Sequence, residues 1–190
     1  MTVIVATYGT DEWAVLGEST AEAHGAIHVH GPTLATARNQ AAERAATDWL
    51  VYLDADDSLA DGYLDAMALA YGDLRAPVLE LHYPDDRVVR PDLTGRDIER
   101  TNPCCIGTAI RRTLLLDCGG FWEEPAWEDY SLFRRAWLLG ATITHVPGAV
   151  YRATVRPGSR NNSVKEPGAL LKSIHTSHAM WLEEREQRGA

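Results

Sequence analysis

A short apolar run that ends in three carboxylates constrains this chain more than any other stretch of it. Residues 49–53 (Trp-Leu-Val-Tyr-Leu) are typical of a buried strand, and Asp54, Asp56 and Asp57 follow at once. Carboxylates this close repel one another unless a cation lies among them, and carboxylate oxygens are the ligands that Mg²⁺ and Mn²⁺ prefer. Since a hard divalent ion favours a diphosphate, the run predicts a metal site that binds a phosphorylated donor. An ordinary acidic loop after a strand is the alternative interpretation.

Composition narrows the class of protein. The 190 residues suit one compact domain, expected over residues 1–190 with a C-terminal helix at about 166–187 as an appendage. The net charge of −9 argues against nonspecific nucleic-acid partners and against anionic membranes. The uncharged stretch 136–151 is shorter than the roughly 20 residues of a membrane span, so no transmembrane segment is expected. Residues 1–7 are typical of a strand rather than a signal peptide, and the sparse cysteines suggest reduced thiols, so a cytoplasmic location is expected.

Strand and helix patterns alternate along the chain. The expected strands cover residues 2–7, 26–30, 49–53, 77–82 and 141–146, and the expected helices cover about 11–23, 32–47, 60–71, 109–117, 127–139 and 166–187. Residues 83–103 are polar and are expected to form a long surface loop or lid. The alternation predicts a three-layer α/β/α fold around a mostly parallel mixed sheet, in which ligands bind at the carboxyl ends of the strands.

A second carboxylate pair, Glu128 and Asp129, stands at the start of the helix expected over 127–139. Exposed backbone N–H groups and the helix dipole stabilise negative charge there, so such a carboxylate stays ionised and can act as a general base. Ordinary N-terminal capping is the alternative, because Asp and Glu are common in the first turns of helices.

Arginines form the third cluster. Arg152 and Arg156 lie in residues 152–160, where a Pro-Gly pair rules out a continuous helix, so a loop is expected. Planar guanidinium groups suit bidentate phosphate contacts, which predicts a diphosphate clamp, with a solvated basic loop as the alternative. Arg38, early in the helix expected after Pro32, is placed to reach the same site, with an ordinary surface arginine as the alternative.

The order of these motifs resembles a known family. They are Ala6-Thr7-Tyr8, Ala37-Arg38-Asn39, Leu53-Asp54-Ala55-Asp56-Asp57, Gly119-Gly120-Phe121-Trp122-Glu123, Glu128-Asp129-Tyr130-Ser131-Leu132 and Tyr151-Arg152. Each motif is modest, but their joint order and spacing are specific, and over about residues 2–160 they resemble the family 2 glycosyltransferases of the GT-A fold. Within that family the chain looks most like the short glycosyltransferases of actinobacterial phages.

The resemblance implies roles for residues on the donor side. The segment matching Thr7 and Tyr8 lines the nucleotide base in the family, and the arginine matching Arg38 approaches the nucleotide. The first Asp of the Asp-x-Asp motif, here Asp54, contacts the ribose or the metal shell, and the last, here Asp56, binds the divalent ion that bridges the two phosphates. The implied cofactor is Mn²⁺ or Mg²⁺, and the implied donor is a UDP- or GDP-sugar.

On the acceptor side, Asp129 matches the general base that deprotonates the acceptor hydroxyl, and Glu128 would orient it or the acceptor. The implied reaction is inverting: the hydroxyl attacks the anomeric carbon in line while the metal stabilises the leaving nucleoside diphosphate. No motif specifies the acceptor, which is open among a glycan, a lipid-linked sugar, a small molecule and a protein side chain. A homodimer is equally open.

Two departures from the family pattern bear on the donor. The family has a separate second strand ending in an acidic residue that contacts the base, whereas here the strand 26–30 leads straight to the next helix. The base is therefore open, with an acidic residue of 11–12 as a substitute contact. Many relatives carry a histidine where this chain has Thr154, so weaker metal binding is expected unless His145 or Arg156 compensates.

Three other functions fit parts of the pattern. A haloacid-dehalogenase-type phosphatase would use Asp54 as nucleophile and Asp56 as acid–base, but it needs a later lysine followed by a paired-Asp motif, and no Asp follows Lys165. A sugar-nucleotide nucleotidyltransferase would need a glycine-rich loop with a basic residue after the first strand, which this chain lacks. A degenerate relative that binds nucleotide sugar or glycan without transfer is the third, although the intact Asp-x-Asp and Glu-Asp pairs argue against it.

Overall fold

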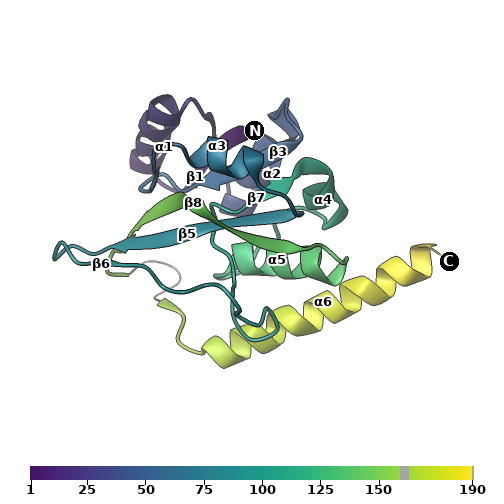
Figure 1. The fold of residues 1–190 in the computed structure, drawn as a ribbon. Coiled ribbons are helices and arrows are strands. Elements are labelled where there is room, and N and C mark those ends of the chain that lie inside the picture. The colour runs from purple at the N-terminus through teal and green to yellow at the C-terminus, as the bar shows by residue number, and fades with distance from the viewer. Residues whose placement is uncertain (159–162, 190) are drawn as a thin grey trace. The chain divides into compact units, whose positions relative to one another are not determined.

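The computed structural model of the protein describes residues 1–158 and 163–189. It separates into two compact units, Met1–Arg156 and Pro157–Ala190. The first unit holds the sheet and helices α1 to α5, and the second holds helix α6, Pro167–Gly189 (Figure 1). All the residues predicted to form the site belong to the first unit.

Within the described residues, eight strands form one mixed sheet. The strands are β1 Thr2–Tyr8, β2 Ile27–Gly31, β3 Trp49–Leu53, β4 Ser58–Leu59, β5 Leu74–His82, β6 Val88–Val89, β7 Ala109–Arg111 and β8 Ile143–Thr154. The helices of the first unit are α1 Asp11–His24, α2 Leu34–Arg44, α3 Tyr63–Leu69, α4 Arg112–Asp117 and α5 Glu128–Leu138. The order of strands in the sheet is β2-β1-β3-β7-β5-β8-β4, and β6 pairs with β5.

The five longest strands run in one direction. β1 pairs in parallel with β2 and β3, and β5 pairs in parallel with β8. β7 is antiparallel to both β3 and β5, so β5 regains the direction of β3. The carboxyl ends of these five strands therefore share one edge of the sheet, where ligands bind in folds of this class. Because the long ladders are parallel and helices cover the sheet, the predicted mixed α/β fold is confirmed.

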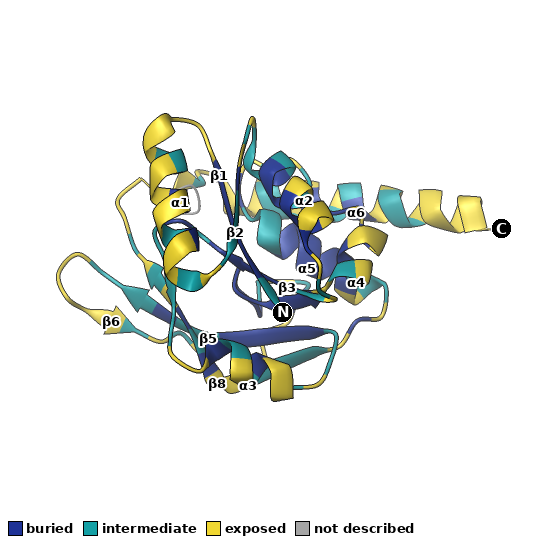
Figure 2. Ribbon diagram, turned by 90° about the horizontal axis from the view of Figure 1, so that it is seen from above, coloured by how far each residue is buried: buried dark blue, intermediate teal, exposed yellow. Residues whose placement is uncertain are grey.

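Helices lie against both faces of the sheet. Figure 2 shows α1 and α2 on opposite sides of β1 and β2. On the α1 side, a Cβ at Gly17 would lie 2.6 Å from the Thr7 side chain, so only glycine permits this approach. On the α2 side, the Tyr52 hydroxyl of β3 donates to the Arg38 carbonyl at 3.3 Å. The core between these layers includes the fully buried Ile4, Val5, Leu50, Val51, Ala37 and Ala41.

One expected helix begins as a strand. The first three residues of the helix expected over 109–117 form β7, and α4 begins at Arg112. Ile110 pairs with Leu50 of β3 and with Leu74 of β5, so β7 fills the gap between those strands. Tertiary pairing thus decides the conformation of a segment that is too short to show a period. β6 similarly lies within the segment 83–103 that was expected to be a loop.

Strand β8 is longer than expected and corrects the placement of one arginine. The strand expected over 141–146 continues to Thr154, and Pro147 and Gly148 pass through it at a shift in its register with β5. Such a bulge tolerates a proline, because no ladder N–H is required there. Arg152 therefore lies in a strand and not on the loop predicted from the sequence.

The side chain of Asn39 in α2 holds the loop that leads to α5. Its Nδ2 donates to the Phe121 carbonyl at 2.9 Å, and its Oδ1 accepts from the Phe121 N–H at 2.8 Å. Gly120, in a left-handed conformation with φ 70°, approaches this amide so closely that a Cβ there would lie 2.6 Å from Asn39 Oδ1. Both backbone groups of Phe121 are thus satisfied by one side chain.

Replacing Asn39 with Ala is expected to lower the free energy of unfolding by about 2 kcal/mol, because two backbone groups of Phe121 lose their partners. Urea unfolding followed by far-UV circular dichroism measures this change. The control is Gln40→Ala at the adjacent exposed position of α2, which should change the free energy by less than about 0.5 kcal/mol. Equal effects of the two substitutions would contradict the role assigned to Asn39.

Candidate functional site

The end of β8 fixes the acidic loop that follows β3. The Asp54 N–H donates to the Tyr151 hydroxyl at 3.1 Å, and that hydroxyl donates to Asp57 Oδ2 at 2.8 Å. The Thr154 N–H donates to Asp57 Oδ1 at 2.7 Å, and the Thr154 hydroxyl donates to the Asp56 carbonyl at 2.7 Å. Thr154, the position at which the resemblance suggested a histidine, therefore has a structural part in shaping the loop.

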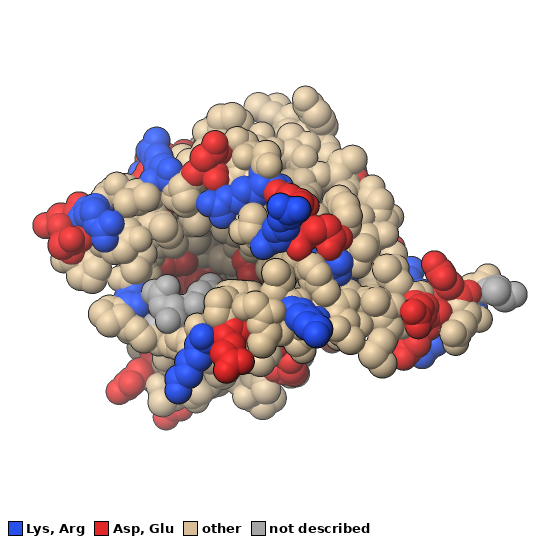
Figure 3. Space-filling model, turned by 90° about the horizontal axis from the view of Figure 1, so that it is seen from below, with Lys and Arg blue, Asp and Glu red and all other residues tan. Residues whose placement is uncertain are grey.

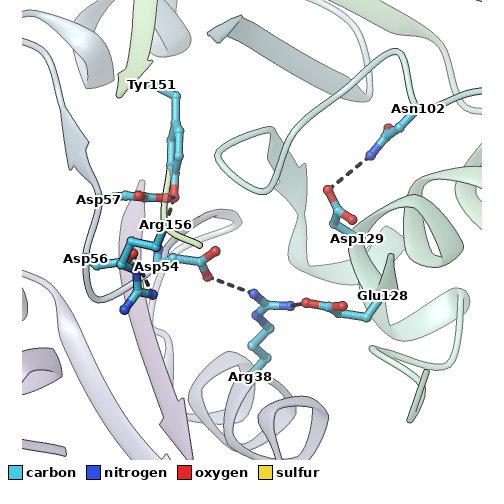
Figure 4. A network of polar contacts seen from close by, with 9 residues as sticks. All are labelled: Arg38, Asp54, Asp56, Asp57, Asn102, Glu128, Asp129, Tyr151 and Arg156. Carbon is cyan, nitrogen blue, oxygen red and sulfur yellow. Dashed lines mark hydrogen bonds and ion pairs between the residues drawn. The ribbon is translucent and has the colours of Figure 1, made fainter. Parts of the chain in front are cut away.

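Arg38 joins the two carboxylate motifs of the sequence. Its Nη2 donates to Asp54 Oδ1 at 2.9 Å, and its Nη1 donates to Glu128 Oε1 at 2.7 Å (Figure 4). The Arg38 side chain is 2% exposed, against 40% for Asp54 and 13% for Glu128. Burial alone would lower the pKa of Arg38, but the Glu128 and Asp54 carboxylates raise it, so the guanidinium stays charged. The sequence predicted that Arg38 approaches a nucleotide, and this stays a prediction. It did not reveal that Arg38 bridges Asp54 and Glu128.

Asp129 lies beside this bridge in the first turn of α5. Its Oδ2 accepts a hydrogen bond of 3.0 Å from Asn102 Nδ2. Desolvation raises the pKa of Asp129 to about 6, and the Glu128 carboxylate acts in the same direction. A carboxyl group with this pKa is ionised at neutral pH and is a stronger base than an ordinary aspartate.

Asn102 is a site residue that sequence reasoning missed. It lies in the 83–103 segment expected to be a loop or lid, and its Oδ1 also accepts from the Cys104 N–H at 3.0 Å. The amide is therefore held by the backbone on one side while it contacts Asp129 on the other. A single asparagine in a polar loop carries no pattern, so only the path of the loop identifies it.

The two predicted clamp arginines point to different carboxylates. Arg156 Nη2 lies 2.8 Å from Asp56 Oδ2, and its guanidinium carbon lies 4.6 Å from the centre of the Trp13 ring. Arg152 instead lies 3.5 Å from Glu80, through its Nε. Only Arg156 thus reaches the acidic loop, while residues 159–162 of the predicted basic loop lie outside the described residues.

The residues expected to line a nucleotide base lie at the carboxyl end of β1. Tyr8 is 38% exposed, whereas Thr7 is only 3% exposed. The Thr7 hydroxyl lies 2.9 Å from His28 Nε2 and 3.0 Å from His30 Nδ1. Both histidines belong to β2. This strand pairs directly with β1, so no strand ending in an acidic residue lies between β1 and β2. The two histidines were missed because their contact with Thr7 depends on this register.

The donor atoms of the acidic loop fit a hard cation that is shared with phosphates. Within residues 1–158 and 163–189, no group of three or more His, Cys, Asp or Glu side chains forms a metal cage. Asp54 and Asp56 supply carboxylate oxygens, and Mg²⁺ commonly binds one or two carboxylates together with substrate phosphates. Desolvation raises the pKa of Asp57 to about 8, and the Asp54 charge acts in the same direction. Figure 3 shows Asp and Glu side chains next to Lys and Arg side chains on one face of the molecule.

The sequence of the chain matches a known protein family. The sequence model of the family described as "Glycosyl transferase family 2" matches residues 3–138, which is more than half of the chain. The match includes the acidic loop, Arg38 and the pair Glu128 and Asp129, and it ends before β8. No curated protein sequence matches the chain. Among the described residues, no helix is long and apolar enough to cross a membrane.

Solved structures share the fold at low sequence identity. S. aureus TarS 1–349 in complex with UDP-GlcNAc is 17% identical with a TM-score of 0.59, and the match covers 86% of this chain and 61% of that one. GalNAc-T7 with UDP, GalNAc and Mn²⁺ is 14% identical with a TM-score of 0.53, and the match covers 83% of this chain and 44% of that one. The chain thus spans about three fifths or less of the length of these structures.

Replacing Arg38 with Met is expected to lower the free energy of unfolding by about 3 kcal/mol, because the mostly buried Glu128 and the more exposed Asp54 lose their cation. Chemical denaturation at pH 7 measures the change. Arg44→Met at the exposed end of α2 should cost less than about 0.5 kcal/mol. Adding Glu128→Gln to Arg38→Met should recover part of the loss, because one unpaired charge disappears. Absence of any recovery would contradict the bridge.

Proposed function

The chain belongs to glycosyl transferase family 2, and from this premise we propose that it transfers a sugar from a nucleoside-diphosphate donor to an acceptor hydroxyl. The observation that carries the proposal is the Arg38 bridge. It ties the acidic loop after β3 to the first turn of α5, and so brings the proposed diphosphate site beside the proposed base. Finding these two motifs on opposite faces of the sheet would have excluded a common site.

The donor site is proposed at the shared carboxyl edge of β1 and β3. Asp54 and Asp56 would hold Mn²⁺ or Mg²⁺, which when bound neutralises the charge that develops on the leaving diphosphate. Arg156, already in contact with Asp56, is placed to exchange its carboxylate partner for a phosphate. Exposed Tyr8 would contact the nucleotide base, with Thr7 beneath it. The UDP-GlcNAc, UDP and Mn²⁺ in the similar structures support a donor of the UDP- or GDP-sugar class.

The acceptor site is proposed around Asp129. As general base, Asp129 would take the proton of the acceptor hydroxyl while that oxygen attacks the anomeric carbon, which gives inversion in a single displacement. Glu128 is held by Arg38 and would orient the acceptor from one side. Asn102 donates to Asp129 and fixes the direction of its carboxylate. Arg38 itself, with both terminal nitrogens engaged, is proposed to position these carboxylates rather than to react.

The remaining predictions from the sequence are also proposals. The acceptor class is a glycan, a protein side chain, a lipid-linked sugar or a small molecule, and the proposed location is the cytoplasm. The resemblance to short glycosyltransferases of actinobacterial phages, a single domain over residues 1–190 and a homodimer belong to the same group. A relative that binds nucleotide sugar without transfer is the principal rival, and turnover distinguishes it from an enzyme.

A thermal-shift panel of nucleoside diphosphates and nucleotide sugars, with and without Mn²⁺, tests the donor site. One donor should raise the melting temperature by several degrees in the presence of Mn²⁺, since a ligand at about 100 times its Kd stabilises the native state by about 2.7 kcal/mol. Asp56→Ala should abolish the Mn²⁺-dependent part, while Asp61→Ala, at an exposed position after β4, should retain it. If no donor shifts the wild-type protein, the proposed function fails.

Turnover as a function of pH tests the base. Because Asp129 must be ionised to accept a proton and its pKa is raised to about 6, kcat/KM should fall about tenfold per pH unit below pH 6. Asp129→Asn should lower kcat at least about 100-fold with donor binding retained, whereas Asp65→Asn, exposed in α3, should not. Full activity of Asp129→Asn would remove this residue from the mechanism, and an inactive wild type that still binds donor would favour the binding module.

A further inference from the structure

Two arginines and a histidine gather around one buried carboxylate beside the site. Glu80 Oε2 accepts from Arg90 Nε at 2.9 Å and from Arg90 Nη2 at 2.6 Å. Glu80 Oε1 lies 2.7 Å from His82 Nε2 and 3.5 Å from Arg152 Nε. Glu80 and His82 belong to β5, Arg90 follows β6, and Arg152 belongs to β8. These four residues are called the Glu80 cluster below.

The Glu80 cluster carries surplus positive charge. Hydrogen bonds from Arg90 lower the pKa of Glu80, so this residue contributes one negative charge against two guanidinium groups. Among the described residues, Arg90 and Arg152 have no second carboxylate partner. Glu80 is 8% exposed, whereas Arg90, Arg152 and His82 are 63%, 47% and 40% exposed. The surplus is therefore open to solvent, in a protein whose net charge is −9.

The Glu80 cluster projects from the face of the sheet that carries α5. Side chains alternate between the two faces along a strand, and Arg75 of β5 faces α3, where it donates to the Met67 carbonyl at 2.7 Å. Glu80, five positions later, faces the other side. Arg75 also lies 3.7 Å from the Trp49 ring, so Tyr52 of β3 shares the face of Glu80. Tyr52 contacts α2, which the Arg38 bridge joins to α5.

The Glu80 cluster is separate from the acidic loop although one strand serves both. Tyr151 bonds to Asp54 and Asp57, and the next residue, Arg152, points to the opposite face, toward Glu80. Arg152 is thus directed toward Glu80 and, among the described residues, forms no ion pair with the carboxylates that are proposed to hold the donor diphosphate. This direction leaves its guanidinium for a different anion.

Resting on the proposed sugar transfer, we propose that the Glu80 cluster binds an anionic group, a phosphate or a carboxylate, of the acceptor. Arg90 and Arg152 donate to the anion, and the buried Glu80 holds both guanidinium groups in place. Asp129, to which the acceptor would offer its hydroxyl, lies in the first turn of α5, and α5 covers this same face of the sheet (Figure 1). On an acidic protein, a local positive surplus there favours an acidic acceptor over a neutral one.

Calorimetric titration tests the subsite with small probes. Glycerol 3-phosphate and glucuronate are titrated into full-length protein saturated with Mn²⁺ and its preferred nucleoside diphosphate, with glycerol and glucose as neutral counterparts. At least one anion should bind and neither neutral compound should, and the two anions distinguish phosphate from carboxylate. The double variant Arg90→Gln and Arg152→Gln should weaken anion binding at least about tenfold. Arg87→Gln, whose partner is the exposed Asp85, should change it less than about twofold.

Two results would overturn the subsite. They are unchanged anion binding in the double variant, whether or not its melting temperature falls, and loss of nucleoside-diphosphate binding together with anion binding. The last would make the cluster part of the donor site. If the double variant does not fold, Arg152→Gln alone serves, because Glu80 then keeps Arg90 and His82. Failure of the wild type to bind any nucleoside diphosphate would defeat the proposed function instead, and anion binding to metal-free protein would then test the cluster by itself.

Discussion

One buried guanidinium holds the site together. Arg38 comes from α2 and binds Asp54 after β3 and Glu128 at the start of α5, so two consecutive elements and a third one, 90 residues beyond Arg38, meet at one charge. A charge taken out of water must be paired, and breaking such a pair costs more than the pair itself contributes. Neighbouring contacts also connect α2 to α5. Asn39 binds the loop before α5, and Arg135 of α5 donates to the Gly120 carbonyl of that loop at 2.9 Å. The position of Asp129 follows from this frame.

Strand direction explains why the chemically important residues meet at one edge. β7 is short and antiparallel to both of its neighbours, and by this it returns β5 and β8 to the direction of β1 and β3. Tyr8, the acidic loop and Arg156 therefore follow strand ends at the same edge, although up to about 150 residues separate them. Alternation along β8 then sends Tyr151 to the acidic loop and Arg152 to Glu80. Strand β8 therefore contributes one residue to the negatively charged acidic loop and the next residue to the positively charged Glu80 cluster.

The sequence predicted those parts of the molecule whose signal is local. The limits of β3, the acidic loop after it and the start of α5 were read correctly, because a strongly apolar run and a first-turn acidic pair need no tertiary information. β7 was taken for helix, since three residues show no period and only pairing with β3 and β5 makes them a strand. The direction of Arg152 depended on a bulge at Pro147, and the contacts of His30 and Asn102 depend on register and loop path. Such contacts cannot be predicted from the pattern of residue types along the sequence.

The balance of charge in the site favours joint binding of a cation and a diphosphate. The carboxylates of the site belong to Asp54, Asp56, Glu128 and Asp129, and the guanidinium groups belong to Arg38 and Arg156. A diphosphate alone would meet this negative surplus and be repelled. A cation alone would be attracted but would find few protein ligands, since the described residues form no cage of three. Each partner thus supplies what the other lacks, so we expect the metal and the nucleotide to bind as one unit, with Arg156 moving from Asp56 to a phosphate as they enter.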